Sequence, residues 1–185
     1  MGIVLLVIGF GFKVAAVPFH MWAPDVYHGS PTPVTAFMAV GPKAAAFAAF
    51  FRVFKEGIPN MAANWEILLC IVAVLSMFVG NLGAIMQTNI KRMLAFSSIS
   101  HAGYLIIAVI AKSSLAGSGL LFYMLTYAFT TFGAFGIVIL LGRKGEENLE
   151  LENYSGLAYK HPLLALSMTV FLLSLGGLPP FAGFV

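Results

Sequence analysis

The composition of this 185-residue sequence is that of a membrane protein. Hydrophobic residues make up 60% of the chain and charged residues only 9%, and the mean hydropathy is +0.95. Because a soluble domain carries about a quarter charged residues, this composition excludes a domain that covers its own surface in water. The formal net charge of +3 comes from lysines and arginines spread along the connections, so we expect no nucleic-acid partner.

Long apolar runs predict six membrane-spanning helices of roughly 20 residues, and the sixth is interrupted near 176–180. The six lie at about 1–17, 33–53, 65–86, 93–111, 119–141 and from 162 onward. The predicted fold is an all-α polytopic transmembrane helix bundle with proline-broken helices, in which residues 1–185 are part of a single transmembrane domain. The chain starts without the basic region of a signal peptide and stops without a polar flank, so we expect a fragment of a longer protein.

The basic residues of the connections predict an orientation. Counted over alternate connections, five lie on one side and three on the other. The larger set is Lys91, Arg92, Arg143, Lys144 and Lys160, and the smaller set is Arg52, Lys55 and Lys112. Since cytoplasmic loops carry the excess of lysine and arginine, we expect the larger set in the cytoplasm. The long polar connection 142–160 on that side is expected to be a solvated loop or a docking site for a neighbouring subunit.

Lys13 is the most informative residue of the first span, because twelve apolar or glycine residues precede it. A lysine at that depth costs about 2.5–3.5 kcal/mol. Either it reaches back to an interface, or it faces a hydrated path on which its proton is exchanged. Pro18 cannot donate to the carbonyl of Val14, so the helix should kink or open just beyond Lys13, which favours the hydrated path. His20, past the break, is either a further proton relay or a packing histidine.

The second span has a similar arrangement around Lys43. This lysine lies about ten residues inside the span and directly follows Gly41-Pro42. Because Pro42 leaves the carbonyl of Met38 without its helical donor, we expect a second interrupted span. Small alanines on the other side would let a neighbouring helix approach closely. Two lysines beside proline breaks on consecutive spans indicate that Lys43 is a second site of proton exchange.

Polar stripes run along the fourth and fifth spans at helical spacing. They consist of Ser97, Ser100, His101 and Tyr104 on the fourth span, and of Tyr123, Thr126, Tyr127 and Thr130 on the fifth. The hydroxyl groups either hydrogen-bond between helices and hold the bundle together, or belong to a polar chain. We expect His101 to be a titratable link in such a chain. The predicted proton relay therefore consists of Lys13, Lys43 and His101.

The chain offers no cofactor chemistry. Its single cysteine, Cys70, cannot form an internal disulfide, and no Cys/His cluster has metal-ligand spacing. Neither a nucleophile with its base, nor a phosphate-binding loop, nor a pair of carboxylates can be assembled from these segments. We therefore expect neither a cofactor nor a metal in this chain.

Several long motifs, in order along the chain, resemble one known family. They are GFK at 11–13, VPFHMW at 17–22, APDVY at 23–27, GSPTPV at 29–34, NIKRMLAFSSISHAGY at 89–104 and GGLPPFAGF at 176–184. They are similar to the antiporter-like membrane subunits of respiratory complex I, and to its N-type branch rather than the L and M types. The resemblance covers essentially the whole chain.

This resemblance implies a larger bundle with two inverted repeats, of which this chain would hold the end of the first and most of the second. It implies that Lys13 is the central protonatable group on the first broken helix and that Lys43 links it toward the second half-channel. His101 would lie near the proton path of the second repeat. A partner glutamate would lie before Met1, and the lysine of the second broken helix would follow Val185.

The function implied by the resemblance is proton translocation by a membrane-arm subunit of NADH:quinone oxidoreductase, coupled to electron transfer from NADH to quinone. The whole complex would use NADH, FMN, iron–sulfur clusters and quinone, with none of them bound in this chain. Expected partners are the other membrane-arm subunits, protons, and the lipid of a bacterial inner (plasma) membrane. The alternatives are a subunit of a cation/proton antiporter or membrane-bound hydrogenase complex, and an architectural membrane subunit without proton transfer.

Overall fold

The computed structural model describes residues 2–142, 148–181 and 183, which form a bundle of helices. Among them η1 is a π-helix, and η2 and η3 are 3-10 helices. The elements are α1 (Gly2–Val14), α2 (Trp22–Gly29), α3 (Thr32–Arg52), η1 (Val53–Gly57), η2 (Pro59–Met61), α4 (Ala62–Ile85), α5 (Ile90–Ile110), α6 (Ala116–Leu141), η3 (Leu151–Tyr154), α7 (Leu157–Lys160) and α8 (Pro162–Leu175). The predicted all-α polytopic fold is confirmed.

Four stretches of helix are long and apolar enough to cross a membrane: Thr32–Gly57, Pro59–Ile85, Ile90–Ile110 and Ala116–Leu141. The first and sixth predicted spans, α1 and α8, are apolar but shorter. Each ends at a break, after Val14 in α1 and after Leu175 in α8. The segment after the first break contains the short helix α2, with Pro24 and Asp25 in its first turn.

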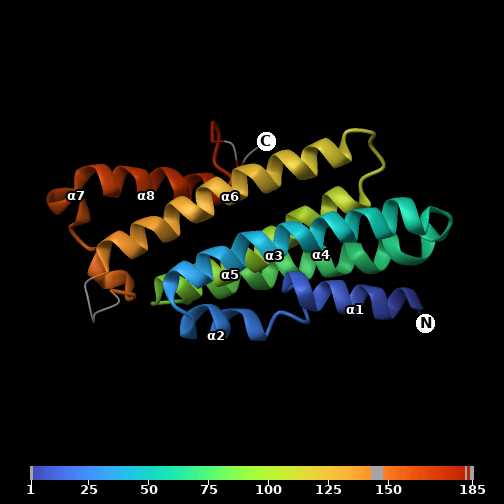
Figure 1. The fold of residues 1–185 in the computed structure, drawn as a ribbon, viewed down its shortest axis with the longest axis horizontal. Coiled ribbons are helices and arrows are strands. Elements are labelled where there is room, and N and C mark those ends of the chain that lie inside the picture. The colour runs from blue at the N-terminus through green and yellow to red at the C-terminus, as the bar shows by residue number, and fades with distance from the viewer. Residues whose placement is uncertain (1, 143–147, 182, 184–185) are drawn as a thin grey trace.

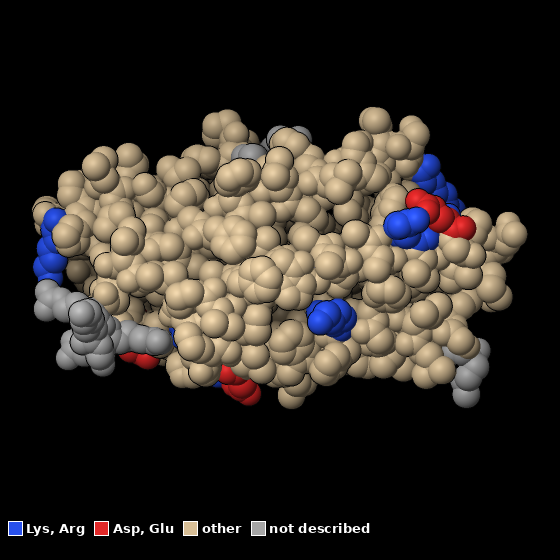
Figure 2. Space-filling view, viewed as in Figure 1, with Lys and Arg blue, Asp and Glu red and all other residues tan. Residues whose placement is uncertain are grey.

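The long helices α3, α4, α5 and α6 run along the longest axis of the molecule (Figure 1). Helices α1 and α2 follow one another along one side of the bundle, and α8 lies along α6 on the opposite side. On the face in Figure 2 most of the surface is uncharged; some charged groups lie toward the two ends of this axis, and one basic and one acidic group lie between them in its lower half. A surface with so few charges suits helices in the hydrocarbon core of a bilayer.

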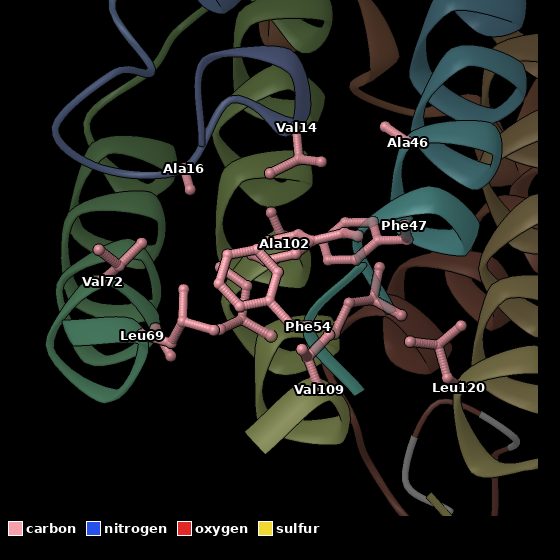
Figure 3. Packing of buried hydrophobic residues seen from close by; sticks show 14 of the residues in the cluster. Val14, Ala16, Ala46, Phe47, Phe54, Leu69, Val72, Ala102, Val109 and Leu120 are labelled. Atoms are coloured by element: carbon pink, nitrogen blue, oxygen red, sulfur yellow. The ribbon is translucent and has the colours of Figure 1, made fainter. Parts of the chain in front are cut away.

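A cluster of buried aromatic rings holds α3 and η1 against α4 and α5. The ring centroids of Phe50 and Phe54 lie 4.9 Å apart, and those of Phe54 and Trp65 lie 5.4 Å apart. Phe54 is fully buried and points in among the side chains of α4 and α5, including Ala102 and Val109 of α5 (Figure 3). This packing fixes the position of α3, which carries Lys43, relative to the helix that carries His101.

Pro42 lies inside α3 without interrupting it, so the predicted break in the second span is wrong. The missing N–H of Pro42 removes only one hydrogen bond of a 21-residue helix. Lys43, the next residue, contacts Ser98 of α5 and the Tyr127 ring of α6, so both helices hold α3 at this point. Packing against neighbouring helices is how membrane helices tolerate an internal proline.

The connection 142–160 is packed against the bundle in its described part. Leu149 and Leu151 contact the core cluster around Ile90 and Leu94, and the Ile90 N–H donates to the Leu149 carbonyl at 2.8 Å. Most residues of 148–160 are nevertheless exposed and none is buried, so this part lies at the surface as predicted, although it is folded into η3 and α7. The basic residues predicted for the cytoplasmic side at 143 and 144 lie outside the described residues.

Gly80 marks the place where α4 and α5 approach most closely. A Cβ atom at Gly80 would lie 2.5 Å from the backbone nitrogen of Ser100 and 2.9 Å from the carbonyl oxygen of Phe96. Both are backbone atoms inside α5, so they cannot move aside without shifting the helix. Small residues at helix interfaces permit this close approach in membrane bundles.

The G80A substitution should therefore destabilise the full-length protein by about 1–3 kcal/mol, the usual cost of overpacking. The measurement is the thermal unfolding midpoint in detergent. Gly136, in α6, is the matched control, because a Cβ there meets no atom within 4 Å. G136A should leave the midpoint unchanged or raise it, since alanine favours helix by about 1 kcal/mol over glycine. Equal midpoints for the two variants would contradict the close contact at Gly80.

Candidate functional site

The break between α1 and α2 is real, and protein groups satisfy its backbone. Helix α1 ends at Val14, and Ala15 has a left-handed conformation with a φ of 59°. That conformation costs a non-glycine residue about 1–2 kcal/mol, so the surrounding packing must hold it. The Val17 N–H donates to the hydroxyl of Ser76 on α4 at 2.9 Å, and both residues are buried. The predicted opening of the helix next to Lys13 is confirmed.

Lys13 lies in the last turn of α1, and its side chain is exposed on the outer surface of the described chain. The ammonium has no hydrogen bond or salt bridge with any residue that the structure describes. Lys13 thus lies directly before the predicted break, but no described residue pairs with it.

Lys43 lies in the middle of α3 and is buried, with 4% of its surface exposed. Its Nζ donates to the carbonyl of Ser98 on α5 at 2.6 Å and also to the Ser98 hydroxyl. Both acceptors are neutral, and no described carboxylate forms a salt bridge with it. A buried ammonium without a carboxylate partner is unfavourable among apolar residues. Lys43 can therefore release its proton.

Tyr127 on α6 lies between Lys43 and His101. The Lys43 Nζ is 5.6 Å from the centroid of the Tyr127 ring, which is within the range of a cation–π contact. The same ring lies 5.0 Å from the His101 ring, centroid to centroid. Three helices therefore bring Lys43, Ser98, Tyr127 and His101 into one contiguous polar cluster.

His101 continues this cluster toward α6. It is 4% exposed, and its Nδ1 shares a 2.7 Å hydrogen bond with the Tyr123 hydroxyl, either group being able to donate. The Tyr104 ring lies 5.9 Å from the His101 ring. Since an imidazole can take up a proton on one nitrogen and release one from the other, His101 is suited to pass a proton along.

A small cavity of about 10 Å³ lies beyond His101, between α6 and the end of α8. Its volume is at the lower limit for one water molecule. Its polar lining consists of His101, Tyr123, Thr126, Tyr127, Thr130 and Ser174. Helix α8 ends directly after Ser174, and Gly177 follows with a φ of 69°. The cluster therefore runs from Lys43 to the second broken helix, whose predicted position is confirmed.

The hydroxyl stripe of the fifth span has two kinds of members. The hydroxyls of Thr126 and Thr130 donate to carbonyls of their own helix, at 2.9 Å in both cases, so they do not bond to a neighbouring helix. Tyr123 and Tyr127 instead contact α5 through His101. Only the two tyrosines thus join the polar cluster directly.

The sequence interpretation missed Ser98, which makes both hydrogen bonds of Lys43. The stripe was drawn through Ser97 because that residue is four positions before His101, whereas Ser98 is three positions before it. Both spacings place a side chain on the same side of a helix, so the pattern alone could not separate them. Ser98 lies close to Lys43 because of the way in which α5 packs against α3, and a local sequence pattern does not show this packing.

Lys91 was counted as a loop charge, but its side chain is buried with 1% exposed. Its Nζ donates to the Ser30 carbonyl at 2.7 Å, at the C-terminal end of α2, where carbonyl groups attract a cation. The neighbouring Arg92 forms a 2.5 Å salt bridge with Asp25 of α2. Asn89 caps α5 by accepting from the Lys91 and Arg92 N–H groups, so the helix begins before these two residues.

The comparison with protein families gives a match over the whole chain. The family described as "NADH:quinone oxidoreductase/Mrp antiporter, TM" matches residues 1–185. Among curated proteins, NADH-quinone oxidoreductase subunit N of Trichlorobacter lovleyi is 56% identical over 184 residues. That alignment covers 100% of this chain and 38% of the relative, so the chain spans well under half the length of the protein it matches.

Solved structures give the same result at the level of the fold. A chain of respiratory complex I from Thermus thermophilus, solved with bound aureothin, is 47% identical with a TM-score of 0.82. The match covers 98% of this chain and 39% of that one. A chain of the Mrp complex from Dietzia sp. is 27% identical with a TM-score of 0.87, over 98% of this chain and 34% of that one.

Proposed function

The chain belongs to the NADH:quinone oxidoreductase/Mrp antiporter family of transmembrane proteins, and on that premise we propose that it is part of a proton-translocating membrane-arm subunit of NADH:quinone oxidoreductase. The resemblance seen in the motifs is thereby confirmed. In the proposed function, electron transfer from NADH to quinone elsewhere in the complex drives protons through this subunit. Residues 1–185 would form part of a single proton-translocating domain.

The polar cluster from Lys43 to His101 is the observation that supports this proposal. Lys43 has neutral acceptors and lies in the uncharged middle of the bundle. It would hold the proton in transit, and Ser98 and Tyr127 would connect it to His101. His101 would pass the proton through its hydrogen bond with Tyr123 toward the water-sized cavity at the end of α8. Lys13, at the other break, would exchange protons with groups beyond the described residues.

The proposed partners are the other membrane-arm subunits of the complex, the lipid bilayer and protons. The similar solved chains come from multisubunit membrane complexes, which supports such partners. The proposed location is the inner (plasma) membrane of a bacterium, in keeping with the bacterial relative. NADH, FMN, iron–sulfur clusters and quinone would be bound by other parts of the complex.

A cation/proton antiporter subunit is the second candidate, because a chain of an Mrp complex has the same fold. The 47% identity to a complex I chain, against 27% to the Mrp chain, favours the first candidate. Both candidates use a buried lysine and differ in what drives the proton.

Reconstitution of the parent complex into vesicles with an internal pH dye distinguishes the two. The proposal predicts that NADH with quinone changes the internal pH, and that an imposed Na⁺ or K⁺ gradient without NADH does not. Proton movement driven by the cation gradient alone would contradict the proposal and favour the antiporter. A complex that oxidises NADH without moving protons would contradict both candidates.

A further inference from the structure

Two adjoining cavities lie at one end of the bundle, away from the polar cluster. The first, of about 470 Å³, is an open hollow bordered by α5, η3, α7 and α8, with a mainly apolar lining that includes Met93, Leu151, Ala165, Met168 and Leu172. Its volume is in the range of small-molecule sites, about 300–1,000 Å³. The second, of about 390 Å³, lies between the end of α6 and α7.

The second cavity is polar where the first is apolar. Its polar groups are Asn148, Asn153, Tyr154, Lys160 and His161. The exposed Glu150 and Glu152 belong to the same connection but line neither cavity. Among the described residues, Lys160 is therefore the charged group that lines this cavity, and His161 can carry a second positive charge. A basic lining of this kind suits an anionic ligand.

Tyr154 and Leu157 line both cavities and so mark their junction. The Tyr154 hydroxyl is buried and has no hydrogen-bond partner among the described residues. Burial raises the pKa of Tyr154 to about 12, so the phenol keeps its proton at neutral pH and can donate a hydrogen bond. A buried donor left open at the meeting point of an apolar and a polar cavity calls for an acceptor on a ligand that extends into both.

The two cavities lie where membrane helices end. Helix α5 begins at Ile90, α6 ends at Leu141 and α8 begins at Pro162, and residues of all three helices line the cavities. Next to them Leu163 of α8 is 78% exposed, and Tyr159 is 95% exposed. An exposed leucine near an exposed tyrosine in the chain is typical of the level at which acyl chains meet headgroups.

We propose that this pair of cavities binds one anionic phospholipid of the bilayer. One acyl chain occupies the apolar cavity, the phosphate lies beside Lys160 and His161, and an ester oxygen accepts the hydrogen bond of Tyr154. Basic pockets between membrane helices on the cytoplasmic side bind anionic headgroups in this way. Free phosphate would leave the apolar cavity empty, and an apolar helix of a neighbouring protein would leave Lys160 without a counter-charge.

Native mass spectrometry of the full-length protein tests the proposal. The protein is equilibrated with vesicles of equal parts phosphatidylglycerol and phosphatidylcholine that have the same acyl chains. It is then released from the vesicles into the gas phase, and the mass of the protein with its retained lipid is measured. We expect one phosphatidylglycerol retained per protein, in preference to phosphatidylcholine. The double variant K160Q/H161Q should retain about tenfold less of it, because it loses the charge-assisted contacts to phosphate. A165W, which fills the apolar cavity, should lose the lipid as well.

K112Q is the matched control, because Lys112 is an exposed lysine at the other end of the bundle, paired with Glu66. It should retain the lipid like the unchanged protein, and excess inorganic phosphate should not displace the lipid. Equal retention of phosphatidylcholine would overturn the proposal, as would lipid retained by both K160Q/H161Q and A165W. Displacement by inorganic phosphate would also overturn the proposal and reduce the site to a phosphate site.

Discussion

Replacing Lys43 by methionine should lower NADH-driven proton pumping by about 10²-fold, the usual contribution of a group that transfers a proton. Methionine has a similar length and no titratable group, so the link between Lys43 and Ser98 would be lost while the volume is kept. The protein should remain folded, because replacing a buried charge by an apolar residue of similar size is often neutral or stabilising. The measurement is the initial rate of pH change in vesicles per NADH oxidised.

The K112M variant controls for the general effect of removing a lysine. Lys112 lies at one end of the bundle with its side chain 79% exposed, and its salt bridge with Glu66 contributes little to stability. K112M should pump like the unchanged protein. Full pumping by K43M at normal thermal stability would exclude Lys43 from the relay, and would favour an architectural role for the polar residues.

Replacing Lys13 by methionine should also lower pumping by about 10²-fold, and it should leave the unfolding midpoint unchanged. Lys13 makes no hydrogen bond or salt bridge with the described residues, so its removal breaks no contact among them. Its backbone lies at the end of α1, two residues before the left-handed Ala15. A loss of pumping without a loss of stability would therefore be a loss of proton transfer.

The K13R variant separates charge from proton exchange. Arginine keeps the positive charge, but it does not release a proton in a protein. K13R should therefore pump as poorly as K13M if Lys13 exchanges protons. Normal pumping by K13R would mean that Lys13 supplies only a fixed charge, and normal pumping by both variants would remove Lys13 from the mechanism.

The fold could be predicted where sequence signals are strong and local. Long apolar runs marked the four membrane-length helices, and Pro18 marked the break after α1. Pro42 was misleading because the same local signal produced no break in α3. The difference lies in the packing around each proline, because α3 is held by α5 and α6 at that point, and packing partners cannot be read from a local pattern.

The candidate site could be predicted in its residue types but not in its contacts. Lys43 and His101 stood out because a charge and an imidazole are costly among apolar residues. Their connection through Tyr127 depends on how α3, α5 and α6 pack together, as does the choice of Ser98 over Ser97. Lys13 is exposed because no described helix covers that side of α1. The sequence of α1 alone does not show which helices pack against it.

The central claim is that Tyr127 and His101 act in series on one proton path, and a double-mutant cycle of pumping rates tests it most directly. Y127F removes the hydroxyl of the ring that lies between Lys43 and His101. H101Q keeps an amide at the position of the imidazole but cannot titrate. Because the two residues act in one path, the double variant should pump no more slowly than the slower single variant. If the two single losses multiply in the double variant, the residues act independently and the relay from Lys43 to His101 is wrong.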